Sequence, residues 1–129
     1  MLSQHNPAIL VTADDHDELI ELALKALGRA PGAALLLREM QRAQVVDSLP
    51  DNVLAMNDGV AFAYDGRDYR DFKLVYPNCA DFADGRISVL TPVGAALIGL
   101  AEGDAMTWAD EVGGLHQLTV TKVSPRRAA

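Results

Sequence analysis

A run of five polar residues, Asp14-Asp15-His16-Asp17-Glu18, is a dense group of possible metal ligands. Carboxylate oxygens suit hard divalent cations, and an imidazole nitrogen suits zinc. Successive side chains on a helix point in different directions, however, so neighbours in the sequence cannot converge on one ion. Acidic residues in the first turn of a helix are instead stabilised by the helix dipole. The run therefore predicts the start of a helix, and we expect no metal site.

The single cysteine, Cys79, is the one possible thiol nucleophile. Nucleophilic catalysis by a thiol needs an adjacent base that is itself held in place. No histidine or acid stands at a recognisable motif spacing from Cys79, so we interpret it as a structural or exposed thiol. A lone cysteine also cannot form an internal disulfide. We expect no catalytic residue and no cofactor.

The charge of the chain argues against direct nucleic-acid binding. The 129 residues carry a formal charge of −7, and the one adjacent basic pair is Arg126-Arg127. Proteins that bind a duplex normally present a basic face to the phosphates. The N-terminal stretch lacks the basic region and the long apolar run of a signal peptide, and no run approaches the length of a membrane span. These features predict a cytoplasmic protein that binds neither membranes nor specific nucleic-acid sequences.

Two helices are expected to precede the rest of the chain. Thr12 is a typical N-cap residue, and apolar residues recur at helical spacing up to Gly28. A tight turn, Arg29-Ala30-Pro31-Gly32, separates this helix from a second one over residues 33–46. Helices joined by so few residues fold back antiparallel. We therefore predict a helical hairpin, a short coiled coil, within an N-terminal domain of residues 1–49.

After the polar linker at residues 48–52, the apolar residues adopt the period of two that is typical of strands. We expect strands at residues 53–56, 60–64, 69–76, 87–89, 106–108 and 115–123. Thr91 and Pro92 suit the N-cap and the first position of a short helix that is apolar almost all round and therefore buried. The predicted fold class is α+β, with an antiparallel sheet and one buried helix in a second domain of residues 50–129.

The run TPVGAALIGL at residues 91–100, preceded by ISV at 87–89 and followed by EGD at 102–104, resembles the signature of the C-terminal domain of the Gre transcript-cleavage factors. A second set of matches is similar to the regulators of nucleoside diphosphate kinase within the same superfamily. This set comprises Leu36, Glu39 and the RAQ at 42–44, then the MN at 56–57 and the LVYP at 74–77. The resemblance implies an FKBP-like fold for the second domain.

The resemblance also implies a partner, RNA polymerase, with docking at the rim of its secondary channel. In the family the loop that enters the short helix contributes to docking, which here is Leu90, Thr91, Pro92 and Val93. The Gre proteins often carry an acid just before the Ser-Pro pair, where this chain has Leu90. We expect the protein to compete with Gre factors for this site.

Stimulated transcript cleavage is not expected. Gre factors place two carboxylates at the tip of a long coiled coil, where they help to hold a Mg²⁺ ion, since hard cations prefer oxygen ligands. The corresponding tip here is Arg29, Ala30, Pro31 and Gly32, which contains no acid. The hairpin is also too short to reach far into a channel. The resemblance therefore predicts a non-enzymatic regulator that occupies the channel mouth.

Two other functions stay open from the sequence. An FKBP-like fold could support a prolyl isomerase, with Tyr64, Tyr69, Phe72, Tyr76 and Trp108 as candidate pocket residues. Aromatic residues on strands more often belong to the core, and a fold does not imply a function. The chain could also be an oligomerisation or ligand-binding module unrelated to polymerase.

Overall fold

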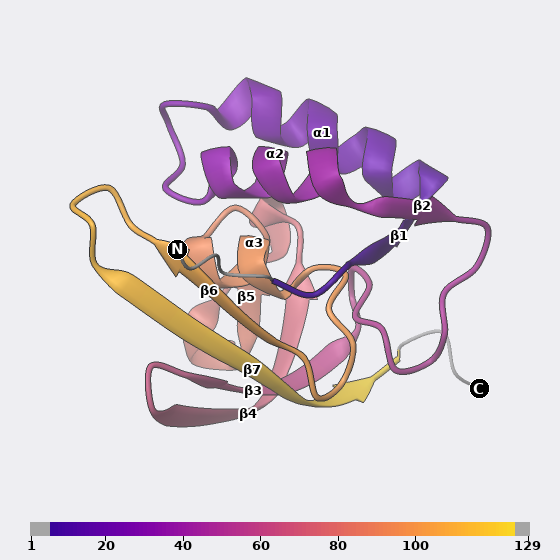
Figure 1. Cartoon of the computed structure of the whole chain (residues 1–129), viewed down its shortest axis with the longest axis vertical. Coiled ribbons are helices and arrows are strands. Elements are labelled where there is room, and N and C mark those ends of the chain that lie inside the picture. The colour runs from indigo at the N-terminus through magenta and orange to yellow at the C-terminus, as the bar shows by residue number, and fades with distance from the viewer. Residues whose placement is uncertain (1–5, 126–129) are drawn as a thin grey trace.

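The computed structural model describes residues 6–125, so the Arg126-Arg127 pair lies outside the described residues. The chain forms three helices and seven strands within this range, together with two short 3-10 helices in one loop. In chain order the elements are β1 (Leu10–Thr12), α1 (Ala13–Ala26), α2 (Ala33–Arg42), β2 (Gln44–Val46), β3 (Gly59–Tyr64), β4 (Arg67–Val75), η1 (Pro77–Cys79), η2 (Phe82–Asp84), β5 (Arg86–Ser88), α3 (Pro92–Leu97), β6 (Ala105–Ala109) and β7 (Leu115–Ser124). Helices and a mixed sheet together give the predicted α+β class (Figure 1).

The first helix begins as the sequence predicts. The Thr12 side chain accepts a hydrogen bond from the Asp15 N–H at 3.3 Å, and Asp14 and Asp15 lie in the first turn. The hydrogen bond satisfies one of the free N–H groups at the start of the helix, and the two acidic side chains interact favourably with the helix dipole. Helix α1 ends at Ala26, just before Gly28, which has a φ of +77°. Helix α2 then runs back alongside α1 (Figure 1).

The second helix is shorter than predicted. It ends at Arg42, and residues 44–46, which were expected to be helical, form β2. Ala43 has an extended backbone, and β2 pairs in parallel with β1, with Val45 opposite Val11. The β-branched Val45 and Val46 suit this strand, whose pairing partner lies far away in the sequence. The local helical pattern therefore gave the wrong boundary.

The main sheet has five strands in the order β5-β4-β3-β7-β6. Its strands pair antiparallel except for β5, which pairs in parallel with β4, so the prediction of an antiparallel sheet is wrong at this edge. The chain crosses back through η1 and η2 before it enters β5, and this return makes the parallel pairing possible. The FKBP-like character of this domain stays a prediction.

The predicted strand at residues 53–56 is also wrong. Val53 forms an isolated bridge with Ala101, and the pairing does not extend into a strand. The Asp58 carboxylate accepts a hydrogen bond from the Ala55 N–H at 2.9 Å, and Asn57 has a φ of +71°. These contacts turn the chain immediately after the bridge, because a side chain that binds the backbone replaces a ladder partner.

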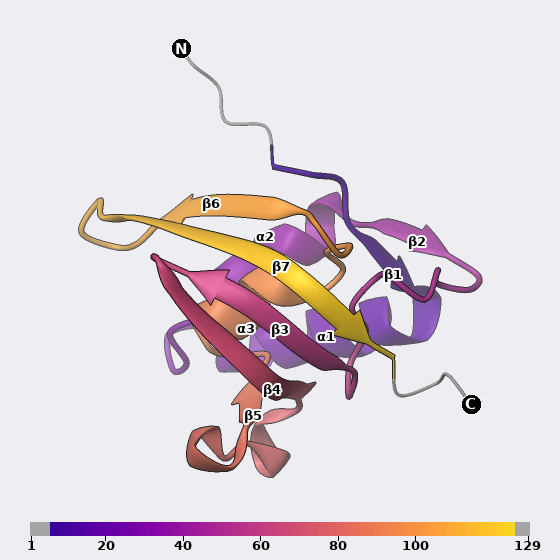
Figure 2. The same cartoon turned by 90° about the horizontal axis from the view of Figure 1, so that it is seen from below.

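The helices cover one face of the sheet, with α3 between the hairpin and the strands (Figures 1 and 2). Helix α3 starts as predicted, since the Thr91 side chain accepts a hydrogen bond from the Gly94 N–H, and residues 94–97 are buried. One hydrophobic core joins the hairpin residues Leu36 and Met40 to Leu97 of α3 and Leu118 of the sheet. The division at residues 49 and 50 stays a prediction, although this core spans it. Within residues 6–125, no helix is long and apolar enough to cross a membrane.

Candidate functional site

The structure brings the predicted docking loop, residues 90–93, against the predicted hairpin tip, residues 29–32. The Gly32 N–H donates a hydrogen bond to the Leu90 carbonyl oxygen at 2.8 Å. A Cβ atom at residue 32 would lie 2.4 Å from that oxygen and equally close to the Thr91 carbonyl group. Only glycine permits this approach of two backbones. The sequence predicted both segments, but the contact between them could not be read from it.

Hydrogen bonds within the docking loop hold it in one shape. The Thr91 hydroxyl accepts from the Gly94 N–H at 3.0 Å and donates to the Ser88 carbonyl oxygen at 2.7 Å. The Ser88 hydroxyl in turn accepts from the Leu90 N–H at 3.0 Å. All four loop residues are half-buried, so each of them is partly accessible at the surface. The loop is therefore a preformed surface feature, which lowers the entropy cost of binding a partner.

A groove of about 640 Å³ lies beside this contact. One side is formed by Pro31, Leu35 and Arg38 from the hairpin together with Pro92 from the docking loop. We call this side the first wall. Another part of the lining, which we call the second wall, comes from the sheet and consists of Trp108, His116 and residues 110–112 of the β6–β7 turn. Of the second wall, only Trp108 was singled out from the sequence, as a candidate isomerase residue, because Asp110 and His116 belong to no motif.

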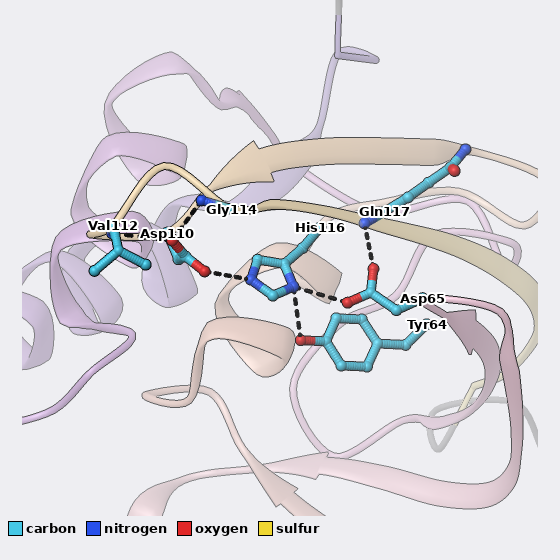
Figure 3. Close-up of polar contacts among 7 residues, drawn as sticks. All are labelled: Tyr64, Asp65, Asp110, Val112, Gly114, His116 and Gln117. Atoms are coloured by element: carbon cyan, nitrogen blue, oxygen red, sulfur yellow. Dashed lines mark hydrogen bonds and ion pairs between the residues drawn. The ribbon is translucent and has the colours of Figure 1, made fainter.

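His116 is the centre of the second wall (Figure 3). Its Nδ1 lies 2.8 Å from an Asp65 carboxylate oxygen and 3.2 Å from the Tyr64 hydroxyl, and its Nε2 lies 2.9 Å from an Asp110 carboxylate oxygen. An ionised carboxylate only accepts hydrogen bonds, so each ring nitrogen needs its own hydrogen to bind its aspartate. The arrangement thus fits a doubly protonated imidazolium between two carboxylates.

The electrostatics of the three groups agree with this geometry. The hydrogen bonds that His116 donates, first to Asp65 and then to Asp110, raise its pKa above its ordinary value. The pKa of Asp65 is lowered by the Gln117 N–H and by His116, and that of Asp110 by His116 and by the Gly114 N–H. Each shift favours the charged form of its group. The cluster is therefore an ion-pair network at the protein surface.

The aromatic residues proposed for an isomerase pocket do not converge on one place. Tyr64 and Trp108 stack on each other beside His116, with ring centroids 6.0 Å apart. Tyr69 and Phe72 belong to a separate cluster, with their rings 5.8 Å apart. The Tyr76 hydroxyl donates a hydrogen bond to Glu18 at the start of α1. The structure therefore divides the five residues among three sites.

The other side chains considered for chemistry lie away from the groove. Asp15 and Glu18 line a separate acidic hollow, in which burial and the neighbouring carboxylates raise the pKa of Asp15. Among the residues that the structure describes, no group of three or more histidine, cysteine or acidic side chains is arranged to hold a metal ion. Cys79 is free and exposed. The groove is consequently the strongest candidate site.

Comparison with known proteins identifies relatives of both the sequence and the structure. Residues 49–125 match the family described as "Transcription elongation factor, GreA/GreB, C-term". The chain is 36% identical over 107 residues to the "Regulator of nucleoside diphosphate kinase" of Escherichia coli K12, a match that covers 79% of this chain and 78% of that protein. The protein of the same name from Shigella flexneri shows the same identity and coverage.

A solved structure, "Prokaryotic transcription elongation factor GreA/GreB from Nitrosomonas europaea", superposes with a TM-score of 0.67. The two chains are 34% identical, and the match covers 90% of this chain and 98% of that one. The docking loop and the second wall lie within the family match at residues 49–125, whereas α1 and α2 precede it.

Proposed function

Since this chain belongs to the GreA/GreB transcription elongation factor family, we propose that it is a non-enzymatic regulator that binds RNA polymerase at the rim of the secondary channel. The observation that carries the proposal is the contact between the docking loop and the hairpin tip, joined by the hydrogen bond from Gly32 to Leu90. Two segments expected to approach polymerase form one continuous surface. A partner that binds Pro92 therefore also meets Pro31.

The hairpin supports binding without stimulation of cleavage. Helix α1 has 14 residues and α2 has 10, so the longer arm spans about 21 Å at the α-helical rise. Its tip lies against the docking loop and carries Arg29 in place of the carboxylates that a second Mg²⁺ would need. The protein thus covers the channel mouth and competes there with Gre factors. Any effect on nucleoside diphosphate kinase, the function named for its relatives, would follow from altered transcription.

Competitive binding to core RNA polymerase tests this proposal. The purified protein should be retained by immobilised polymerase and displaced by an excess of a Gre factor. Pro92→Ser should weaken binding roughly tenfold, equivalent to about 1.4 kcal/mol, because it removes a rigid apolar contact. Arg70→Ala is the matched control, since Arg70 is exposed and lines a different hollow on the sheet.

Two results would contradict the proposal. Absence of retention at moderate salt would remove the polymerase as a partner, and retention that a Gre factor does not reduce would place the contact elsewhere. A stalled complex with backtracked RNA tests the second half of the proposal. The protein should leave the transcript at full length, and shortening above the level seen without any factor would show that it stimulates cleavage.

A further inference from the structure

The β6–β7 turn exposes large apolar side chains beside the groove. Val112, in the middle of the turn, is 93% exposed, and Leu115, at the start of β7, is 77% exposed. Val112 lines the same groove as Pro92 and Trp108. Single exposed apolar residues are common, but Val112 and Leu115 are close in the sequence, and Val112 borders an apolar groove. The turn therefore has the composition of a contact surface.

Asp110 organises the turn from within. Its carboxylate accepts hydrogen bonds from the Val112 N–H at 3.0 Å and from the Gly114 N–H at 2.8 Å. Its backbone N–H donates to the Gly114 carbonyl oxygen at 2.8 Å, and its carbonyl oxygen accepts from the Gly113 N–H at 3.1 Å. The position of Asp110 thus fixes the course of the whole turn.

His116 connects this turn to a second one. Through Nε2 it binds Asp110, and through Nδ1 it binds Asp65, which stands in the turn between β3 and β4. The other Asp65 carboxylate oxygen accepts from the Gln117 backbone N–H at 2.8 Å, so Asp65 is itself anchored to β7. The imidazolium therefore bridges two turns that are neighbours in space and distant in sequence (Figure 3).

We propose that His116 is a positioning residue: while doubly protonated, it holds the β6–β7 turn at the groove so that Val112 makes a second contact with RNA polymerase. The proposal rests on the proposed function, because it assigns a further part of the same docking surface. A neutral imidazole keeps one N–H group, so it can donate to only one of the two aspartates, and loss of the Nε2 proton removes the bond to Asp110 that holds the turn.

The surroundings of His116 decide the direction of the pH effect. Tyr64, Asp65 and Asp110 contact the ring, and Glu111 and Arg38 line the same groove. The two aspartates raise the pKa of His116, so the bridge is complete below the ordinary pKa of histidine and is lost as the pH rises through the raised value. Binding that depends on the bridge should accordingly weaken in alkaline solution.

The charge of the second wall indicates the matching chemistry of the partner. His116 offsets the charge of Asp110, whereas Glu111 gives the rim a negative charge next to Val112. The polymerase segment that fits presents an apolar side chain to Val112 and Trp108 and a basic side chain to Glu111. Such a pairing joins apolar burial to charge complementarity.

Two measurements on matched variants test the proposal. Nuclear magnetic resonance follows the His116 ring and the backbone amides of residues 110–114 from about pH 6 to about pH 9, the range around histidine titration. Competition binding to polymerase is measured over the same range. The variants are His116→Gln, which removes the charge, and Val112→Ser, which removes the apolar contact and leaves the bridge in place. Because His116→Gln lacks the titrating ring, its binding curve also serves as the control for any pH dependence that arises from the polymerase.

In the wild type, the turn amides should titrate together with the His116 ring, and binding should weaken roughly five- to tenfold towards alkaline pH. At the acidic end of the range His116→Gln should bind several-fold more weakly than the wild type, and it should lack the additional loss of binding as the pH rises. Val112→Ser should bind several-fold more weakly and keep the titration of the turn amides.

Independence of the turn amides from the His116 titration would overturn the positioning role. Wild-type affinity of Val112→Ser, with Pro92→Ser still impaired, would overturn the second contact and leave the proposed function intact. If the wild type fails to bind polymerase at any pH, the proposed function and the second contact both fall. The nuclear magnetic resonance titration would still decide whether His116 holds the turn.

Discussion

The two walls of the groove are built by different physical means. The first wall depends on close contact between backbones, since Gly32 approaches Leu90 so closely that no Cβ atom would fit. The second wall depends on charge, since His116 joins Asp65 and Asp110. Backbone packing responds little to pH or salt, whereas exposed ion pairs respond to both. One groove thus combines a fixed side with an adjustable one.

The difference also separates stability from recognition. The first wall continues into the shared core through Leu35 and Leu36, which are buried, so damage to it should weaken the whole fold. The turn of the second wall extends into solvent, with Val112 almost fully exposed, so we expect the fold not to depend on it. Stable scaffolds commonly carry their functional residues on such exposed segments.

The largest effect is expected for Gly32→Ala. The added Cβ would overlap the Leu90 and Thr91 backbones at 2.4 Å, and overpacking of this kind costs roughly 1–3 kcal/mol, so we expect a loss near the upper limit. Denaturant unfolding measures the change in the free energy of unfolding. Polymerase binding should fall as well, because the hairpin tip and the docking loop would separate.

Gly28→Ala provides the control for this substitution. Gly28 has a φ of +77° and nothing within 4 Å of the position that its Cβ would occupy, so alanine there meets backbone strain alone, which costs roughly 1–2 kcal/mol. It should lower stability less than Gly32→Ala and leave polymerase binding unchanged. Equal effects of the two variants on binding would show that the close contact at Gly32 has no special part in the surface.

Asp65→Asn should have an intermediate effect, confined to the second wall. The amide oxygen of asparagine can still accept from the Gln117 N–H, but the negative charge beside His116 is gone. The Asp65 hydrogen bond is the largest cause of the raised pKa of His116, so this pKa should fall towards its ordinary value. A titration of the His116 ring followed by nuclear magnetic resonance measures this change in pKa.

Asp68→Asn is the matched control. Asp68 is an exposed carboxylate on β4, and it is not among the groups that raise the pKa of His116. Asp68→Asn should leave the pKa of His116 unchanged. Added salt should reproduce part of the Asp65→Asn effect in the wild type by screening the pair. An unchanged pKa in Asp65→Asn would mean that Asp110 alone sets the charge of the ring.

Sequence reasoning identified segments of the first wall and missed the ion pairs of the second. Thr91 and Pro92 form a local helix-start signal whose meaning does not depend on distant residues, and the structure has that helix at Pro92–Leu97. The turn before α2 was likewise visible from Pro31 and Gly32. Local signals of this kind predict elements well because the interactions that make them lie within a few residues.

The residues that form the ion pairs at the second wall carry no such signal. Asp65 and His116 are 51 residues apart, and their contact depends on the pairing of β3 with β7. The wrong boundary of α2 has the same origin, because the pairing of residues 44–46 with β1 replaced a helical pattern. Long-range strand pairing decides both cases, and a single sequence does not reveal its register.

Val112→Ser should have the smallest effect on stability and so gives the sharpest test of the comparison between the walls. The side chain is 93% exposed, and surface substitutions of this kind usually change the free energy of unfolding by less than about 0.5 kcal/mol. Unfolding in denaturant should therefore match the wild type while polymerase binding falls. A loss of more than about 1 kcal/mol would show that Val112 packs against the fold. The second wall would then contribute to stability as the first does, and the separation of stability from recognition would not hold.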